Sequence, residues 1–253
     1  EFKGDSSEII VTEALQFITR QTKSKKPFFA VIWYGTPHSP WMALDADKEP
    51  FKKLSPKARD HYGELVAMDR SIGALRKGLR ELAIEKNTLV LFLSDNGACA
   101  EDDRAFKATA RGIPPGPMES YRTQGLPWAN LSNTPFRKFK WWVHEGGIAS
   151  PLIVSWPSVI KRGGHITNQI GHIMDLMPTF LDVAGKKYSD LGKGIGLKQL
   201  EGISLVPVFE GRKIERTNPL YWQFGQCMAV RKGKWKLLAS HPNSSLGIAL
   251  YQN

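Results

Sequence analysis

Cysteine is scarce in this sequence, because only Cys99 and Cys227 occur among its 253 residues. Two cysteines could form one disulfide bond, but they cannot build the framework of bridges that staples small exported proteins. A chain of this length is long enough to bury one large core, or a large and a small one. The cysteine count therefore leaves the cellular compartment open.

Long apolar runs are also missing, and no stretch approaches the ~20 apolar residues that a membrane-spanning helix needs. The first residues, Glu1 to Asp5, do not have the pattern of a signal peptide, and there is no initiator methionine. We therefore expect no membrane span, and we expect that the chain begins inside a longer protein.

Acidic residues are outnumbered, which leaves a net charge of +11. The excess is either an ordinary solvated surface or a surface that attracts anions, such as sulfated or phosphorylated substrates. Lysine and arginine occur in short scattered clusters, at 23–26, 137–140 and 231–236. They do not form one stripe interleaved with aromatic residues, so the sequence does not indicate nucleic-acid binding.

The first third of the chain shows a helix pattern followed by an apolar strand pattern. Asp5-Ser-Ser-Glu8 is typical of a capping box, and the helix that follows it is expected to end before Pro27. Residues 28–33 form a continuous apolar run, typical of a strand that is covered on both faces. The run ends in residues 34–40, a loop rich in turn-forming residues.

The same order of elements then occurs again. A helix is expected from Tyr62 to Glu85 and a buried strand at 89–93, followed at once by Ser94-Asp-Asn-Gly97. This repetition predicts an α/β fold in which a mixed sheet is flanked by helices. In open α/β sheets the chemistry gathers at the carboxyl ends of strands, where His38 and Asp95-Asn96 are found.

The second half of the chain is less regular. Residues 99–140 are rich in glycine and proline, and a loop of this length is usually functional or disordered. A strand is expected at 151–156 and a helix at 171–184, in which Pro178 either begins a new turn or causes a kink. Short β-like stretches after residue 200 predict a small β-rich domain at 201–253, beside a larger domain at 1–200.

Asp95 and Asn96 are candidates for a metal site. A carboxylate beside a carboxamide offers two hard oxygen ligands, which suit Ca²⁺ or Mg²⁺ better than zinc. The alternative is an ordinary turn, because Asp-Asn-Gly is a common turn string.

His38 and Lys140 are candidates for an anion site. His38 lies between Pro37 and Pro40, so its ring could be held to bind an anion or to protonate a leaving group. Lys140 precedes Glu145-Gly-Gly147, whose glycines allow close backbone approach, and it could hold a tetrahedral oxyanion. Taken alone, each of the two residues is more typical of an ordinary surface side chain.

Six segments resemble those of the type I sulfatase family, which depends on formylglycine, and they occur in the family's order. They are Phe28–Pro40, Leu89–Gly97, Asn133–Gly147, Asp175–Gly185, Leu200–Leu205 and Val230–Leu237. The stretch 128–136 resembles the arylsulfatase-like members. The resemblance implies an alkaline phosphatase/sulfatase-like fold, which is incomplete here, and hydrolysis of a sulfate ester to an alcohol or phenol plus sulfate.

The resemblance also implies roles for single residues. Asp95 and Asn96 are expected to bind Ca²⁺, with Mg²⁺ as the other possibility. Lys140 and His38 are expected to contact the sulfate, and His38 is a candidate proton donor to the leaving oxygen. It further implies export to the periplasm, the cell exterior or the lysosome.

One part of the family pattern is absent from this sequence. The formylglycine is made from Cys or Ser in a Cys/Ser-x-Pro/Ala-x-Arg segment, and neither this segment nor the family's two calcium-binding aspartates precede His38. Cys227-Met-Ala-Val-Arg231 fits the short pattern, but it lies after the calcium strand and lacks the Leu-Thr-Gly that follows in the family. We interpret Cys227 as a strand residue. We expect the formylglycine outside this sequence and the chain alone to be inactive.

Two alternatives remain from the sequence. The first is a phosphonate or phosphate monoester hydrolase of the same superfamily, because a phosphate pocket needs the same cations. The second is a non-catalytic sulfatase-like protein that binds sulfated glycans through its basic surface. The sequence does not indicate which sulfate ester is bound or the oligomeric state.

Overall fold

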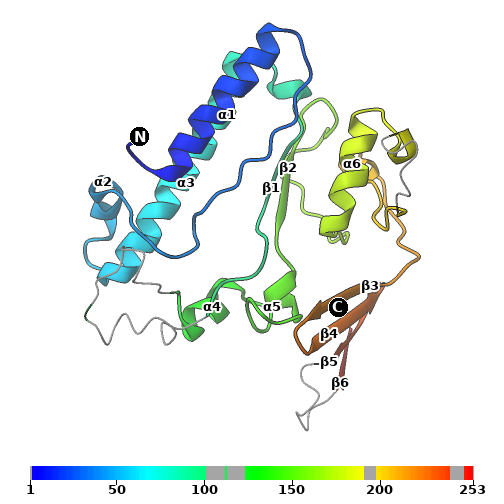
Figure 1. Cartoon of the computed structure of the whole chain (residues 1–253). Coiled ribbons are helices and arrows are strands. Elements are labelled where there is room, and N and C mark those ends of the chain that lie inside the picture. Colours follow the sequence, from blue (N-terminus) through cyan, green and yellow to red (C-terminus); the bar gives the residue numbers. More distant parts are fainter. Residues whose placement is uncertain (1, 101–111, 113–122, 191–197, 240–247, 253) are drawn as a thin grey trace. The chain divides into compact units, whose positions relative to one another are not determined.

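The computed structural model in Figure 1 describes residues 2–100, 112, 123–190, 198–239 and 248–252. The chain divides into two compact units, which are residues 1–85 with 94–150, and residues 86–93 with 151–253. The domain boundary predicted near residue 200 stays a prediction. None of the described helices has the length and apolar character that crossing a lipid bilayer requires.

The first unit consists mainly of helices. They are α1 (Ser6–Lys23), α2 (Asp45–Lys48), α3 (Pro56–Glu81), α4 (Leu126–Ser132) and α5 (Glu145–Ile148), with a 3₁₀ turn at Glu49–Phe51. The long helices α1 and α3 lie side by side, and Val11, Ile18 and Leu79 are buried. Gly78 permits this close packing, because a Cβ there would lie 2.5 Å from Leu15 Cδ2.

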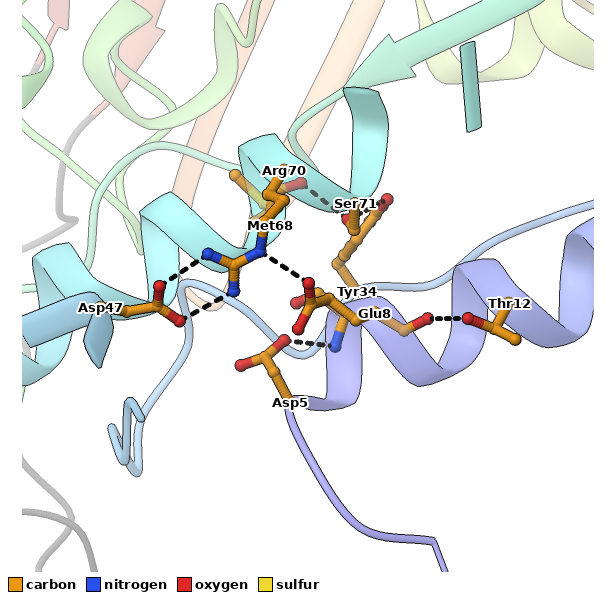
Figure 2. Close-up of polar contacts among 9 residues, drawn as sticks. Asp5, Glu8, Thr12, Tyr34, Asp47, Met68, Arg70 and Ser71 are labelled. Carbon is orange, nitrogen blue, oxygen red and sulfur yellow. Dashed lines mark hydrogen bonds and ion pairs between the residues drawn. The ribbon is translucent and has the colours of Figure 1, made fainter. Parts of the chain in front are cut away.

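Arg70 on α3 ties together three helices of this unit (Figure 2). Its Nε donates to Glu8 Oε1 on α1 at 2.6 Å, and its two terminal nitrogens bind Asp47 on α2 at 2.6 and 2.9 Å. This bidentate pairing with Arg70 holds the pKa of Asp47 below its ordinary value. Asp5 caps α1 as predicted, since its Oδ1 accepts from Ser7 N at 2.8 Å, whereas Glu8 of the predicted capping box pairs with Arg70.

The helix predicted at Tyr62–Glu85 begins six residues earlier, at Pro56, and ends at Glu81. Ser55 is its N-cap, because the hydroxyl accepts from Ala58 N at 3.4 Å, and Pro56 occupies the first turn, where no backbone donor is needed. The Ser-Pro pair therefore marks the helix start more reliably than the first apolar residue.

The apolar run 28–33 is extended, but it belongs to no strand of the described part of the chain. The predicted strand covered on both faces is therefore not formed in this structure. Tyr34, which follows the run, is anchored to α3, because its hydroxyl lies 3.0 Å from Ser71 Oγ (Figure 2).

Two strands and several short helices form one part of the second unit. They are β1 (Val90–Leu93), β2 (Leu152–Ser155), α6 (Leu176–Val183) and α7 (Val206–Phe209), with 3₁₀ turns at Glu85–Asn87, Ile173–Asp175 and Tyr188–Asp190. β1 and β2 pair antiparallel, with Val90 opposite Ser155. Pro178 lies in the first turn of α6, where backbone N–H groups have no intrahelical acceptor, so it starts a helix rather than kinking one.

A buried carboxylate connects this part of the unit. Asp175 is fully buried, and its carboxylate accepts from His172 N at 2.8 Å and from Ile203 N at 2.9 Å. It also pairs with the guanidinium of Arg216. One acid thus satisfies donors from three segments that are far apart in the sequence.

The chain ends in a four-stranded antiparallel sheet in the order β3-β4-β5-β6. Its strands are Leu220–Phe224, Cys227–Lys232, Trp235–Ala239 and Ile248–Gln252. The first two hairpins turn at Gly225 and Gly233, which have φ of +55° and +56°, as tight two-residue turns require. The β-rich tail is therefore confirmed, and Cys227 is the first residue of β4, as its interpretation as a strand residue predicts.

Candidate active site

Two loops of the first unit are joined by backbone hydrogen bonds. Gly97 N donates to the carbonyl of Gly147 at 3.0 Å, and Lys140 N donates to the carbonyl of Ala98 at 3.0 Å. The loop that follows β1 and the loop 133–147 therefore lie against each other. We call this arrangement the loop junction, and it brings the main chain of Lys140 next to the segment that carries Asp95 and Asn96.

Asn133 holds the loop junction from its other side. Its Oδ1 accepts from Ala98 N at 3.1 Å, while its Nδ2 donates to the carbonyl of Lys138 at 3.1 Å. A carboxamide is suited to this position because it accepts and donates at once. This role of Asn133 is not predictable from the sequence, since no local pattern distinguishes a bridging asparagine from one in a turn.

Three glycines make the loop junction sterically possible. A Cβ at Gly97 would lie 1.8 Å from the carbonyl oxygen of Gly146, and one at Gly146 would lie 2.1 Å from that of Lys138. At Gly147 the distance to the carbonyl oxygen of Trp142 would be 2.0 Å. The close approach predicted for Gly146 and Gly147 is confirmed, and Gly97 is needed for the same reason.

Asp95 and Asn96 present oxygen atoms at the loop junction. Oδ1 of the exposed Asp95 accepts from Asn96 N at 3.0 Å and from Asn96 Nδ2 at 3.2 Å, and that Nδ2 also lies 3.2 Å from the carbonyl of Gly97. Because the amide nitrogen is engaged twice, the amide oxygen faces away from these contacts. Asp95 Oδ2 and Asn96 Oδ1 take no part in these three contacts, and both are hard oxygen atoms.

These two residues fit a calcium ion by chemistry but supply only part of its shell. Ca²⁺ takes about six to eight oxygen ligands. In the ranges that the structure describes, no group of three or more His, Cys, Asp or Glu side chains could hold a metal ion. Further ligands for such an ion would have to be backbone, water, substrate or residues other than those described.

Lys140 lies between two residues with unusual backbone conformations. Lys138 has a backbone φ of +69° and Trp141 one of +84°, and residues with a Cβ rarely adopt such positive values. The ammonium of Lys138 lies 4.4 Å from the ring centroid of Trp142, whereas Lys140 is half-buried at the loop junction. Strained backbone of this kind is typical of functional sites, where the surrounding hydrogen bonds maintain it.

His38 is exposed in the loop 34–40, which is anchored on either side of it. Its backbone N donates to the carbonyl of Gly35 at 2.9 Å, and Trp41 Nε1 donates to the carbonyl of Pro37 at 2.8 Å. The ring Nδ1 lies 2.8 Å from the carbonyl oxygen of Ser39, which can only accept, so Nδ1 carries a hydrogen. The contact of His38 with a sulfate stays a prediction.

Two titratable residues that the sequence did not single out support the chain just after His38. Glu64 Oε1 accepts from Met42 N at 2.6 Å, and burial, with nearby Asp5 and Asp60, raises the pKa of Glu64 to about 7. Burial, with a smaller contribution from the charge of Lys57, lowers the pKa of His61 to about 4. The ring centroid of His61 lies 4.6 Å from that of the buried Trp41, and the two rings are tilted by 48°.

Comparison with known proteins finds sulfatases both by family profile and among individual relatives. The sequence profile of the family described as Sulfatase matches residues 1–186. The N-acetylgalactosamine-6-sulfatase of Canis lupus familiaris is 32% identical over 236 residues, which are 92% of this chain and 38% of that protein. The arylsulfatase of Klebsiella aerogenes is 30% identical over 182 residues, which are 66% of this chain and 39% of that protein.

Among solved structures, Ps i-CgsB in complex with k-i-k-neocarrahexaose superposes with a TM-score of 0.74 at 25% identity. The match covers 97% of this chain and 48% of that one. The chain therefore spans about two fifths of the length of the curated relatives it matches, and about half of this structural relative.

Proposed function

Because the chain belongs to the sulfatase family, we propose that it forms part of an enzyme that hydrolyses a sulfate ester to an alcohol or phenol plus sulfate. The fold class predicted from the sequence, alkaline phosphatase/sulfatase-like, is confirmed by the solved relatives. The observation that supports the proposal is the loop junction, in which the main chain of Lys140 is hydrogen-bonded to that of Ala98, three residues after Asp95.

The charges at the loop junction suit an anionic ester. The sulfate group is negative, so the ammonium of Lys140 offsets charge on its oxygens as a nucleophile approaches. The exposed carboxylate of Asp95 would by itself repel such a group. This conflict favours a cation at Asp95 and Asn96. These two residues would hold Ca²⁺, or Mg²⁺, which when bound would supply further positive charge.

His38 is proposed as the group that protonates the leaving oxygen. The carbonyl of Ser39 keeps the hydrogen on Nδ1, so a proton given to the leaving group must come from Nε2. Anchoring of the loop on both sides limits where Nε2 can point. The nucleophile is expected outside this chain.

For the substrate we propose a sulfated sugar. Relatives from five mammals, each 32–33% identical, are all named N-acetylgalactosamine-6-sulfatase. The 25% identical Ps i-CgsB was solved with a carrahexaose. These relatives do not favour a phosphonate or phosphate monoester hydrolase, or a glycan-binding protein without activity. Export of the protein from the cytoplasm stays a prediction that rests on the family resemblance.

The test is hydrolysis of N-acetylgalactosamine 6-sulfate and of an aryl sulfate by the complete protein. We expect Lys140→Ala to lower kcat on the order of 10²–10³-fold, the usual effect of removing one group that stabilises transition-state charge. Lys138→Ala is the matched control on the same loop and should change kcat less than about threefold, because its charge is directed to Trp142. Equal losses in both variants, or full activity without the amine at position 140, would contradict the assignment.

A further inference from the structure

Two acids of helix α3 hold the backbone of the chain just after the loop 34–40. Met42 N donates to Glu64 Oε1 at 2.6 Å, and Ala43 N donates to Asp60 Oδ1 at 3.4 Å. Both acidic residues are only 8% exposed, so their carboxylates need such donors to compensate for burial. The chain that leaves the loop is therefore fixed on α3.

A glycine of α3 lets this segment lie directly against the helix. A Cβ at Gly63 would lie 2.6 Å from the Cβ of Ala43 and 3.2 Å from Lys48 Cγ. Real Cβ atoms do not approach one another as closely as 2.6 Å, so the close contact depends on glycine at this position. The packing therefore leaves the segment after the loop little freedom to shift relative to α3.

Trp41 links helix α3 to the loop that carries His38. Its ring packs on that of His61, and each of these two residues is 4% exposed. Its Nε1 donates to the carbonyl of Pro37 at 2.8 Å, while the backbone N of His38 donates to the carbonyl of Gly35 at 2.9 Å. The place of the Trp41 ring on α3 therefore fixes the peptide group that joins Pro37 to His38.

We propose that Trp41 is a positioning residue for His38, and that its bond to Pro37 holds the imidazole in place to protonate the leaving oxygen. The inference rests on the proposed function, in which His38 gives that proton. An exposed histidine on a loose loop would sample many orientations, and holding it in one of them favours proton transfer. Because Trp41 is buried, it acts through His38 and not by contact with the ester.

The need of the leaving group for a proton separates this role from a general loss of structure. A sugar hydroxyl must be protonated as it leaves, whereas p-nitrophenolate is a stable anion and leaves without a proton. Trp41→Phe keeps a ring against His61 and removes the Nε1 donor. In the complete protein we expect it to lower kcat for N-acetylgalactosamine 6-sulfate at least about tenfold, and kcat for p-nitrophenyl sulfate less than about twofold.

Both esters are assayed on one sample, so a smaller folded fraction lowers both rates equally. Trp128→Phe is the matched control, because the ring of Trp128 contacts Tyr62 on the same helix, and it should leave the ratio of the two rates unchanged. His38→Ala should give the same selective loss, and adding Trp41→Phe to it should cost less than about threefold more. Equal losses on both esters, or losses that multiply in the double variant, would overturn the proposal.

Hydrogen exchange without substrate tests the positioning separately from the reaction. In Trp41→Phe the amide of His38, which donates to Gly35, should exchange at least about tenfold faster, and the amides of α3 should exchange at their original rate. An unchanged rate at His38 would overturn the inference, whether or not the protein hydrolyses an ester. If the unsubstituted protein hydrolyses neither ester, the proposed function is wrong, and the exchange rate still decides whether Trp41 positions His38.

Discussion

Glycine residues, which have no Cβ, allow the two loops of the loop junction to approach each other closely. Gly97→Ala would place a methyl group 1.8 Å from the carbonyl oxygen of Gly146, so the loops that carry Asp95 and Lys140 must separate. We expect this change to lower the free energy of unfolding of the first unit by about 2–4 kcal/mol. Gly73→Ala in α3 is the control, because nothing lies within 4 Å, and it should raise stability by up to about 1 kcal/mol. Denaturant unfolding measures both, and similar small effects would contradict the steric argument.

Glu64 and His61 are predicted to have opposite effects on stability as pH changes. Burial raises the pKa of Glu64 to about 7, so its contribution is present below its ordinary value of 4.5 and is lost as pH rises through 7. Burial lowers the pKa of His61 to about 4, so its contribution is present above 6.5 and is lost as pH falls through 4. Between these limits the two effects offset each other.

Single substitutions should therefore expose one effect at a time. With Glu64→Gln, acidification from pH 7 to 4.5 should lower the free energy of unfolding, because His61 then acts alone. With His61→Phe, which keeps a ring beside Trp41, the same acidification should raise it. Each change is on the order of 2–3 kcal/mol. Melting temperatures across this pH range measure the effect, and parallel curves for the two variants would show that the offset does not exist.

The buried carboxylate of Asp175 connects three segments of the second unit and is expected to stabilise them. In Asp175→Asn the half-buried guanidinium of Arg216 loses its charge partner, and one of two backbone donors loses an acceptor. We expect a loss of about 3–5 kcal/mol in the free energy of unfolding. Asp182→Asn is the control, because Asp182 accepts from Ser204 Oγ at 2.6 Å in an exposed position, and it should cost less than about 1 kcal/mol. Comparable losses would mean that burial of Asp175 has no special effect.

How far the elements could be predicted depends on whether their signals are local. Helix α1 was predicted because its cap and periodicity lie within 20 residues, and β1 and β2 because each is a short apolar run. Helix α4 at Leu126–Ser132 lies inside the stretch 99–140 that the sequence predicts as a loop, since seven residues with a proline give no clear period. The segment 28–33 has the continuous apolar run of a buried strand, but a strand needs a partner that no pattern within the segment can supply.

The candidate site likewise has residues that the sequence predicts and contacts that only the structure shows. Asp95, Asn96 and Lys140 were predicted because their residue types fit the chemistry and their segments resemble a family. The structure adds how the loops that carry them come together, through Asn133 and Gly97. Neither could be found from one sequence, because a bridging amide and a glycine at a close approach are defined by atoms from a distant loop. The predicted roles of His38, Lys140 and the metal pair stay predictions.

For the molecule as a whole, the described residues offer too few ligands for a strong calcium site. Asp95 and Asn96 provide two oxygens where Ca²⁺ takes about six to eight, and no cluster of acidic side chains joins them in the described ranges. We expect the purified 253-residue chain to bind Ca²⁺ with a Kd no tighter than about 1 mM, the weak end of protein calcium sites. We also expect no release of phenol from an aryl sulfate, because the nucleophile is expected elsewhere.

Calorimetric titration with Ca²⁺ and an absorbance assay with p-nitrophenyl sulfate measure these two expectations on the same sample. Asp95→Ala is the informative control, because it removes the only charged ligand of the pair and should change a weak titration little. Micromolar binding that Asp95→Ala abolishes would mean that this chain completes the metal shell by itself. Turnover that depends on Lys140 would mean that it also carries a nucleophile. Weak binding without turnover is the result expected if the loop junction is one side of a site whose other side comes from a further polypeptide segment.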